Sequence, residues 1–296
     1  MAIFAKLAYE HGANTATLLT LRFAFAGTVM WLIVLARGNV RQRLDRRTAI
    51  AGWCLGFFGY SLQAGGFFAS LQHLSASMTA LLLYTYPTLV FIGAVLLGRE
   101  RVSATKIVAL GLAAVGLVLV LAGGGASALN TTGVLLAVGS ALAYTTYILV
   151  ADTVIKDSDP FALTAMVTSG ACVSVGAFTF ISGQFDAASF ETGAWLALTG
   201  VALVSTVIAI TAFFLGLDRV GPSTASIVST VEPPFTVALA AIVFGETLGA
   251  VQLLGGALVL SAVVVLQLRP GSVTNRAAPD HAAPAPAARE VPHSAA

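Results

Sequence analysis

The side chains that could do chemistry here are a few polar groups inside long apolar segments, and Glu232 is foremost among them. It lies with Pro233 and Pro234 near the middle of residues 223–246, a stretch long enough to cross a bilayer, which takes about 20 residues. A carboxylate at that depth is costly and normally faces a partner or a wet cavity. The two prolines remove amide donors and break the helix, as is typical of a midplane solute site. A proline kink with a hydrogen-bonded carboxyl is the alternative.

Two basic residues, Lys6 and Arg22, also fall within apolar segments, and each must find a carboxylate, a carbonyl or water. Because Glu232 is the only acidic residue near the midplane, we expect at least one of the two to face the same cavity. Arg22 lies a turn or two from the external face, so it has the alternative of reaching outward. Burial would favour the protonated form of Glu232 and a nearby base the charged form, which motivates the hypothesis of proton coupling.

Further polar side chains are candidates for the wall of a cavity. Ser229 and Thr236 share the helix face of Glu232. Tyr60 and Gln63 form a polar stripe on an earlier segment, where interhelix hydrogen bonds worth about 0.6 kcal/mol are an equal alternative, and aromatic packing explains Tyr86, Tyr144 and Tyr147 equally well. The candidate substrate-binding residues are Glu232, Arg22, Lys6, Ser229, Tyr60, Gln63, Tyr86 and Tyr144, and the expected helix breaks are at Pro87, Pro233 and Pro234.

The composition indicates which kind of protein must hold these groups. The chain is 57% hydrophobic and 9% charged, with a mean hydropathy of +0.91, whereas about a quarter of the residues in a soluble domain are charged. It is therefore expected to be an all-α integral membrane protein. No HExxH, Ser/His or Walker-type pattern is present, so we expect neither an enzyme nor an ATP-driven pump. We also expect no metal, no cofactor and no nucleic-acid partner.

Ten segments are expected in the membrane. The first ten or so residues are apolar but too short to span alone, and the sequence predicts further spans at 16–36, 48–70, 78–98, 104–122, 133–154, 161–183, 194–216, 223–244 and 249–268. Apart from Lys6 and Arg22, the lysines and arginines lie on alternate links or in the tail. This places both termini in the cytoplasm if the first helix is complete. Residues 269–296 are Ala/Pro-rich and are predicted to form a disordered cytoplasmic tail.

An internal repeat organises the spans. Shifting the chain by 146 residues aligns Pro87 with Pro233 and Glu100 with Glu246 without a gap. Each copy has five spans, an odd number, so the second copy is inverted in the membrane, as in secondary transporters. We expect the two glutamates, which lie at span ends, to cap or contact loops rather than take part in transport.

The repeat also defines the expected domains. They are a first five-helix unit at 1–122, a second at 133–268 and the tail at 269–296. Under the repeat offset Met1 falls on Tyr147, although the sixth span begins near Gly133, so the first helix lacks about half of its expected length. The printed start is therefore expected to be internal to a longer helix.

The residues of the ninth span carry a resemblance to a known family. VEPPFTVALAAIVFGE, its weaker first-half copy YPTLVFIGAVLLGRE and the repeated five-span unit resemble the EamA-type transporters of the drug/metabolite transporter superfamily. Arg22, within TLLTLRFAFAG, matches a usual arginine of that family's second helix. The resemblance implies ten helices in two inverted bundles around a central cavity, and export or exchange of small metabolites, amino acids or drugs. The incomplete first helix departs from the pattern.

The sequence thus predicts a secondary transporter of a small organic solute across the inner membrane by alternating access, with protons as a hypothetical coupling ion. Its expected surroundings are the lipid bilayer. Monomer and homodimer remain open. A non-transporting membrane scaffold or receptor is the alternative, which a flux assay in proteoliposomes separates from a transporter.

Overall fold

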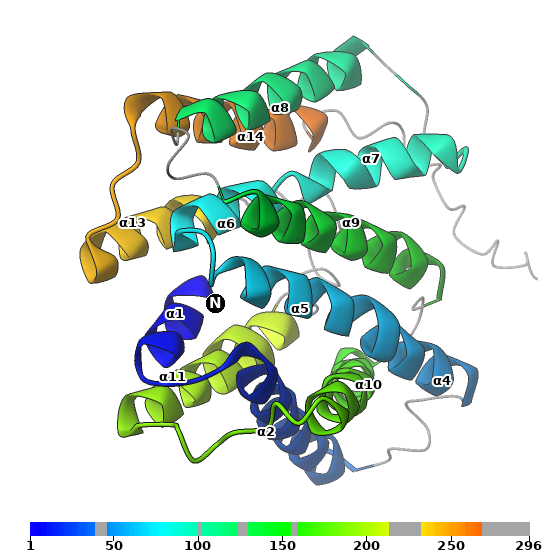
Figure 1. Cartoon of the computed structure of the whole chain (residues 1–296). Helices are drawn as coiled ribbons and strands as arrows, with labels where there is room; N and C mark the ends of the chain where they lie inside the picture. Colours follow the sequence, from blue (N-terminus) through cyan, green and yellow to red (C-terminus); the bar gives the residue numbers. More distant parts are fainter. Residues whose placement is uncertain are drawn as a thin grey trace, which may run out of the picture.

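The structure is a computed structural model that describes residues 1–38, 46–99, 102, 104–123, 130–154, 159–212 and 232–267. Within these residues the regular structure is helical (Figure 1). The elements are α1 (Ala2–Glu10), α2 (Thr15–Ala36), α4 (Arg46–Cys54), η1 (Leu55–Tyr60), α5 (Ser61–Ser70), α6 (Ala76–Leu83), α7 (Tyr86–Leu96), α8 (Ala104–Gly123), α9 (Thr131–Val154), α10 (Pro160–Ile181), α11 (Thr192–Ala202), η2 (Leu203–Ile208), α13 (Glu232–Phe244) and α14 (Ala250–Gln267).

Five helices in this described part are long and apolar enough to cross a membrane. They cover Thr15–Ala36, Ala76–Leu96, Thr131–Ala151, Pro160–Ile181 and Thr192–Ala212, and shorter apolar helices cover Ile107–Gly123, Glu232–Phe244 and Ala250–Val265. Large apolar side chains point outward from these helices; Leu96 is 81% exposed and Ile181 is 87% exposed. Such exposure is expected where lipid rather than water surrounds the protein.

The helix ends follow local sequence signals. The α2 helix begins after Asn14, whose side chain accepts a hydrogen bond from the Thr17 amide at 2.8 Å, and α6 begins after Ser75, whose hydroxyl accepts from the Met78 amide at 3.1 Å. At the other end of α13, Gly245 has φ +63°, a left-handed conformation that glycine adopts without a Cβ penalty. The chain therefore turns sharply between α13 and the residues that follow.

The prolines named in the sequence lie at helix starts. Between α6 and α7 the helix is interrupted at 84–85, and Pro87 lies in the first turn of α7. Pro233 and Pro234 are the second and third residues of α13 as the structure describes it. Residues 213–231, which precede them, are outside the described part, so a broken helix there remains a prediction.

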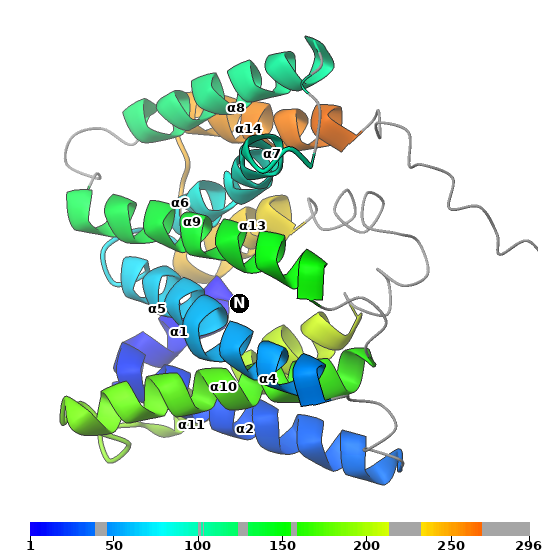
Figure 2. The ribbon, with the colours of Figure 1, turned by 90° about the vertical axis from the view of Figure 1, so that its right-hand side faces the viewer.

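Helices distant in the sequence lie side by side. The α8 helix runs along α14 at one side of the molecule, and α2 along α10 at the opposite side (Figures 1 and 2). Between these layers α5 packs along α9, α1 against α11, and α6 against α13. Glycines allow some of these approaches: a Cβ on Gly56 or Gly170 would overlap the backbone of the facing helix.

Candidate functional site

Arg22, in α2, is fully buried and does not reach toward either surface. Its Nε donates a hydrogen bond to the Thr206 hydroxyl at 2.9 Å, and its Nη2 donates to the Tyr60 hydroxyl at 2.9 Å. The guanidinium carbon lies 5.1 Å from the ring centroids of both Phe23 and Phe68. The alternative that Arg22 extends to the external face is therefore wrong, because neutral hydroxyls and aromatic faces hold it inside.

The two hydroxyls that hold Arg22 come from two π-helical segments. Tyr60 is the last residue of η1, between α4 and α5, and Thr206 lies in η2, which follows α11. The Thr206 hydroxyl also donates to the Val201 carbonyl at 2.9 Å, five residues earlier in the chain. A π-helical turn carries one extra residue, which changes the direction of its side chains, and such turns are frequent at functional sites. Both segments here direct an acceptor at the same guanidinium.

Five of the six tyrosines form a continuous chain of aromatic contacts, called here the tyrosine chain. Neighbouring ring centroids are 6.0 Å apart for Tyr60 and Tyr147, 6.0 Å for Tyr147 and Tyr144, 4.6 Å for Tyr144 and Tyr86, and 5.6 Å for Tyr86 and Tyr84. The chain begins at the hydroxyl that accepts from Arg22. It ends at the Tyr84 hydroxyl, which donates to Glu232 Oε2 at 2.7 Å.

Glu232 is the first residue of α13, and its side chain is exposed rather than enclosed. Among the residues that the structure describes, neither Lys6 nor Arg22 forms an ion pair with it. Thr236, one turn later, is buried. Ser229, the third member of the predicted polar face, is outside the described residues. A cavity shared by Glu232 and a base thus stays a prediction, and the link between Glu232 and Arg22 is aromatic.

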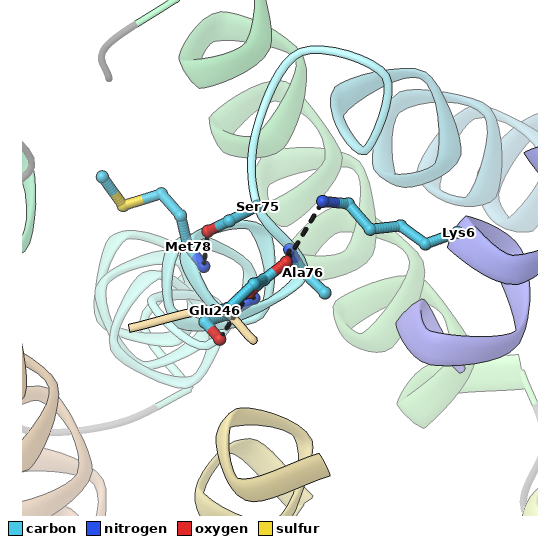
Figure 3. A network of polar contacts seen from close by, with 6 residues as sticks. Lys6, Ser75, Ala76, Met78 and Glu246 are labelled. Carbon is cyan, nitrogen blue, oxygen red and sulfur yellow. Dashed lines mark hydrogen bonds and ion pairs between the residues drawn. The ribbon is translucent and has the colours of Figure 1, made fainter. Parts of the chain in front are cut away.

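Lys6 has a different carboxylate as its partner. Its Nζ lies 3.1 Å from Oε1 of Glu246, on the link between α13 and α14 (Figure 3). Glu246 also accepts hydrogen bonds from the Ala76 amide at 2.8 Å, and from the amide and hydroxyl of Ser77 at 3.1 and 2.8 Å. The expectation that Glu246 caps a helix is confirmed, because these are the first amides of α6.

Electrostatics at this cap favour the charged carboxylate. Partial burial by itself raises the pKa of Glu246, but the two amides, the hydroxyl and the ammonium together hold that pKa below its usual range. The negative charge also lies at the positive end of the α6 helix dipole. Glu246 therefore binds α1, α6 and the α13–α14 link together.

Gln63 and the remaining candidate residues fall into two groups. Gln63, in α5, is buried against α9. Its backbone carbonyl accepts a hydrogen bond from the Ser140 hydroxyl at 2.7 Å, and its side-chain Nε2 lies 3.5 Å from the same hydroxyl. That is the interhelix role given as its alternative. Tyr60, Tyr86 and Tyr144, by contrast, all belong to the tyrosine chain.

Two residues of this arrangement were not predicted as candidates, namely Thr206 and Tyr84. A signal for Thr206 does exist in the sequence, since it follows Tyr60 by the repeat offset of 146 residues. The two partners of Arg22 would therefore occupy the same position in the two copies of the expected repeat. Tyr84 has no such signal, and only the packing of α6 on α13 brings it to Glu232.

Several known proteins are similar to this chain. An uncharacterized transporter of Archaeoglobus fulgidus is 29% identical over 204 residues, covering 69% of this chain and 72% of that protein. The uncharacterized transporter YcbK of Bacillus subtilis is 26% identical over 261 residues, covering 86% and 84%. One crystal structure matches with a TM-score of 0.63 and 20% identity over 90% of this chain and 92% of its own, which supports the fold alone. The model of the EamA-like transporter family matches residues 1–122 and 131–268, so the chain belongs to that family.

Proposed function

We propose that the protein is a secondary transporter that exports or exchanges a small organic solute across the inner membrane by alternating access. The observation that carries this proposal is the continuous path from the buried Arg22 along the aromatic contacts of the tyrosine chain to Glu232. It joins a fully buried cation to a carboxylate at the start of a helix. Polar groups inside a membrane bundle are costly and are kept where a solute or ion passes.

The helix contacts support an inverted repeat. The α2–α10 and α8–α14 pairs each join a segment to its counterpart 146 residues later. Under the same offset α4 falls on α11 and α1 falls on the end of α9, so the α4–α9 contact corresponds to the α11–α1 contact; η1 falls within two residues of η2. Contacts that map onto one another are expected of two copies related by a pseudo-twofold axis. Exchange of the two copies' conformations then provides outward-open and inward-open states of nearly equal energy.

Glu232 is the proposed site of proton coupling. It is one hydrogen bond from the tyrosine chain, and its position at the first turn of α13 places it beside the proposed helix break. A carboxyl that is charged when water reaches it and protonated when it is enclosed couples proton release to opening. Pro233 and Pro234 have no amide hydrogen, so the carbonyls that would otherwise accept from positions 233 and 234 would be available to a solute ammonium or hydroxyl.

The proposed orientation follows from the basic links, which put both chain ends in the cytoplasm if the first helix is complete. The link that holds Glu246 is then external, as is the Ser75 turn before α6. Glu246 therefore ties two external helix ends together in this conformation.

A flux measurement tests the proposal. Cells with and without the protein are screened for differences in accumulation of amino acids, organic acids and amines, and each solute that differs is then followed in proteoliposomes that contain a pH-sensitive dye. We expect protein-dependent solute flux that changes with an imposed pH gradient. A membrane scaffold or receptor would give flux no greater than that of protein-free liposomes.

A further inference from the structure

The guanidinium of Arg22 has one nitrogen without a partner. Its Nε and Nη2 are held by Thr206 and Tyr60, but Nη1 is buried and forms no hydrogen bond. A guanidinium has five N–H donors in one plane, and those on Nη1 have no acceptor here. An unsatisfied buried donor is costly and is uncommon in a folded protein.

The charge of Arg22 is also unbalanced. Both of its hydrogen-bond acceptors are neutral hydroxyls, and no carboxylate within the described ranges forms an ion pair with it. The faces of Phe23, Phe68 and Tyr60 lie 5.1, 5.1 and 5.9 Å from the guanidinium carbon and offset part of the cost. A desolvated cation with an open donor edge is complementary to an anion.

The surroundings favour a particular kind of anion. One guanidinium balances one negative charge, and the aromatic rings around it supply no further strong donors. A phosphate group carries more charge and three acceptor oxygens, so it would be left with unpaired oxygens here. A carboxylate can place one oxygen on Nη1 and its apolar carbon against the rings.

We propose, building on the proposed transport function, that Arg22 is the anion subsite of the transporter and binds the carboxylate of the transported solute through Nη1. Its two anchors come from equivalent positions of the two repeat copies, Tyr60 and Thr206. Because Arg22 is fully buried in this conformation, the helices that hold η1 and η2 must part before a solute reaches it.

Thermal unfolding of the purified full chain in detergent tests the subsite directly. The probes are small carboxylates and their matched primary amides: acetate and acetamide, lactate and lactamide, benzoate and benzamide, and L-amino acids and their amides. Chloride and inorganic phosphate at matched ionic strength serve as further arms. We expect at least one carboxylate to raise the melting temperature in a saturable way, and its amide, chloride and phosphate not to.

Variants then locate the bound anion. Arg22→Gln should weaken binding of that carboxylate by about ten- to a hundredfold, the usual worth of a hydrogen bond to a charged group. Arg22→Lys, which keeps the charge if Gln prevents folding, should bind more weakly than wild type but still prefer the carboxylate to its amide. The matched control is Arg99→Gln, since the Arg99 guanidinium is exposed and donates to the Leu149 carbonyl. It should bind like wild type.

Several results would overturn the proposal. These are equal shifts by carboxylate and amide, equal shifts by carboxylate and chloride or phosphate, undiminished binding by Arg22→Gln, and no shift by any carboxylate of the panel. Failure of the transport function is separate, because it would leave carboxylate binding at Arg22 without protein-dependent flux in liposomes. Flux of a neutral solute that is unchanged in Arg22→Lys would instead retain transport and reject the subsite.

Discussion

Replacing Glu246 with alanine should destabilise the protein more than any other loss of a surface-accessible carboxylate in the described chain. The carboxylate accepts from two amides at the start of α6, and both Ala76 and Ser77 are buried. Each buried amide left without an acceptor costs about 1 to 3 kcal/mol. Since water can enter part of the space left by the side chain, we expect the free energy of unfolding to fall by about 3 kcal/mol.

The ion pair with Lys6 should contribute less than the cap. The Lys6 side chain is 23% exposed and that of Glu246 is 12% exposed, and pairs that solvent reaches are worth about 0 to 1 kcal/mol. A double-mutant cycle of Lys6→Met and Glu246→Ala should therefore give a coupling energy of at most about 1 kcal/mol. Most of the stability lost in Glu246→Ala would then come from the loss of the hydrogen-bond acceptor at the start of α6.

The assay is denaturant unfolding in detergent micelles at neutral pH, with Glu191→Ala as the matched control. Glu191 also pairs with a base, His11 at 3.1 Å, but its side chain is 70% exposed. We expect the control to lose less than about 1 kcal/mol. If Glu246→Ala is no less stable than Glu191→Ala, the carboxylate does not hold α6 and the reasoning is wrong.

The cap also has a pH dependence with a definite sign. The folded state holds the pKa of Glu246 below its usual range, so the folded state binds fewer protons than the unfolded state around that pKa. The stabilisation is therefore present above the unfolded pKa, about 4.3, and is lost as the pH falls through the lower folded value. The difference in stability between wild type and Glu246→Gln should shrink across that acid range.

Three further predictions concern the membrane interior. Glu232→Gln should insert normally but lose the response of flux to an imposed pH gradient; an unchanged response would make Glu232 structural. Gly56→Ala should lower the free energy of unfolding by about 1 to 3 kcal/mol or more, because the added Cβ would overlap the backbone of the facing helix. Gly139→Ala is the control, since a Cβ there meets open space and should leave the unfolding curve unchanged. Thr206→Val removes an acceptor from Arg22 and should destabilise by about 1.5 to 3 kcal/mol; an unchanged unfolding midpoint would contradict that hydrogen bond.

Much of the arrangement could be read from the sequence because it is set by local properties. Apolar length alone indicates a membrane helix, since every backbone polar group in lipid must be bonded within its own segment. The start of α2 after Asn14 and the position of Pro87 at the start of α7 follow from capping and proline chemistry in the same way. The offset of 146 residues pairs segments without any knowledge of where they lie in space.

The partners of the buried polar groups depended on tertiary structure. The sequence identified Lys6, Arg22 and Glu232 as groups that need partners, but not that Lys6 pairs with Glu246 or that Arg22 bonds Tyr60 and Thr206. In lipid no hydrophobic force orders one helix against another, so partner choice depends on close packing and helix rotation. A π-helical turn shifts that rotation by a residue. The sequence therefore determined which side chains need a hydrogen-bond or ion-pair partner, and only the packing of the helices determined which residues supply it.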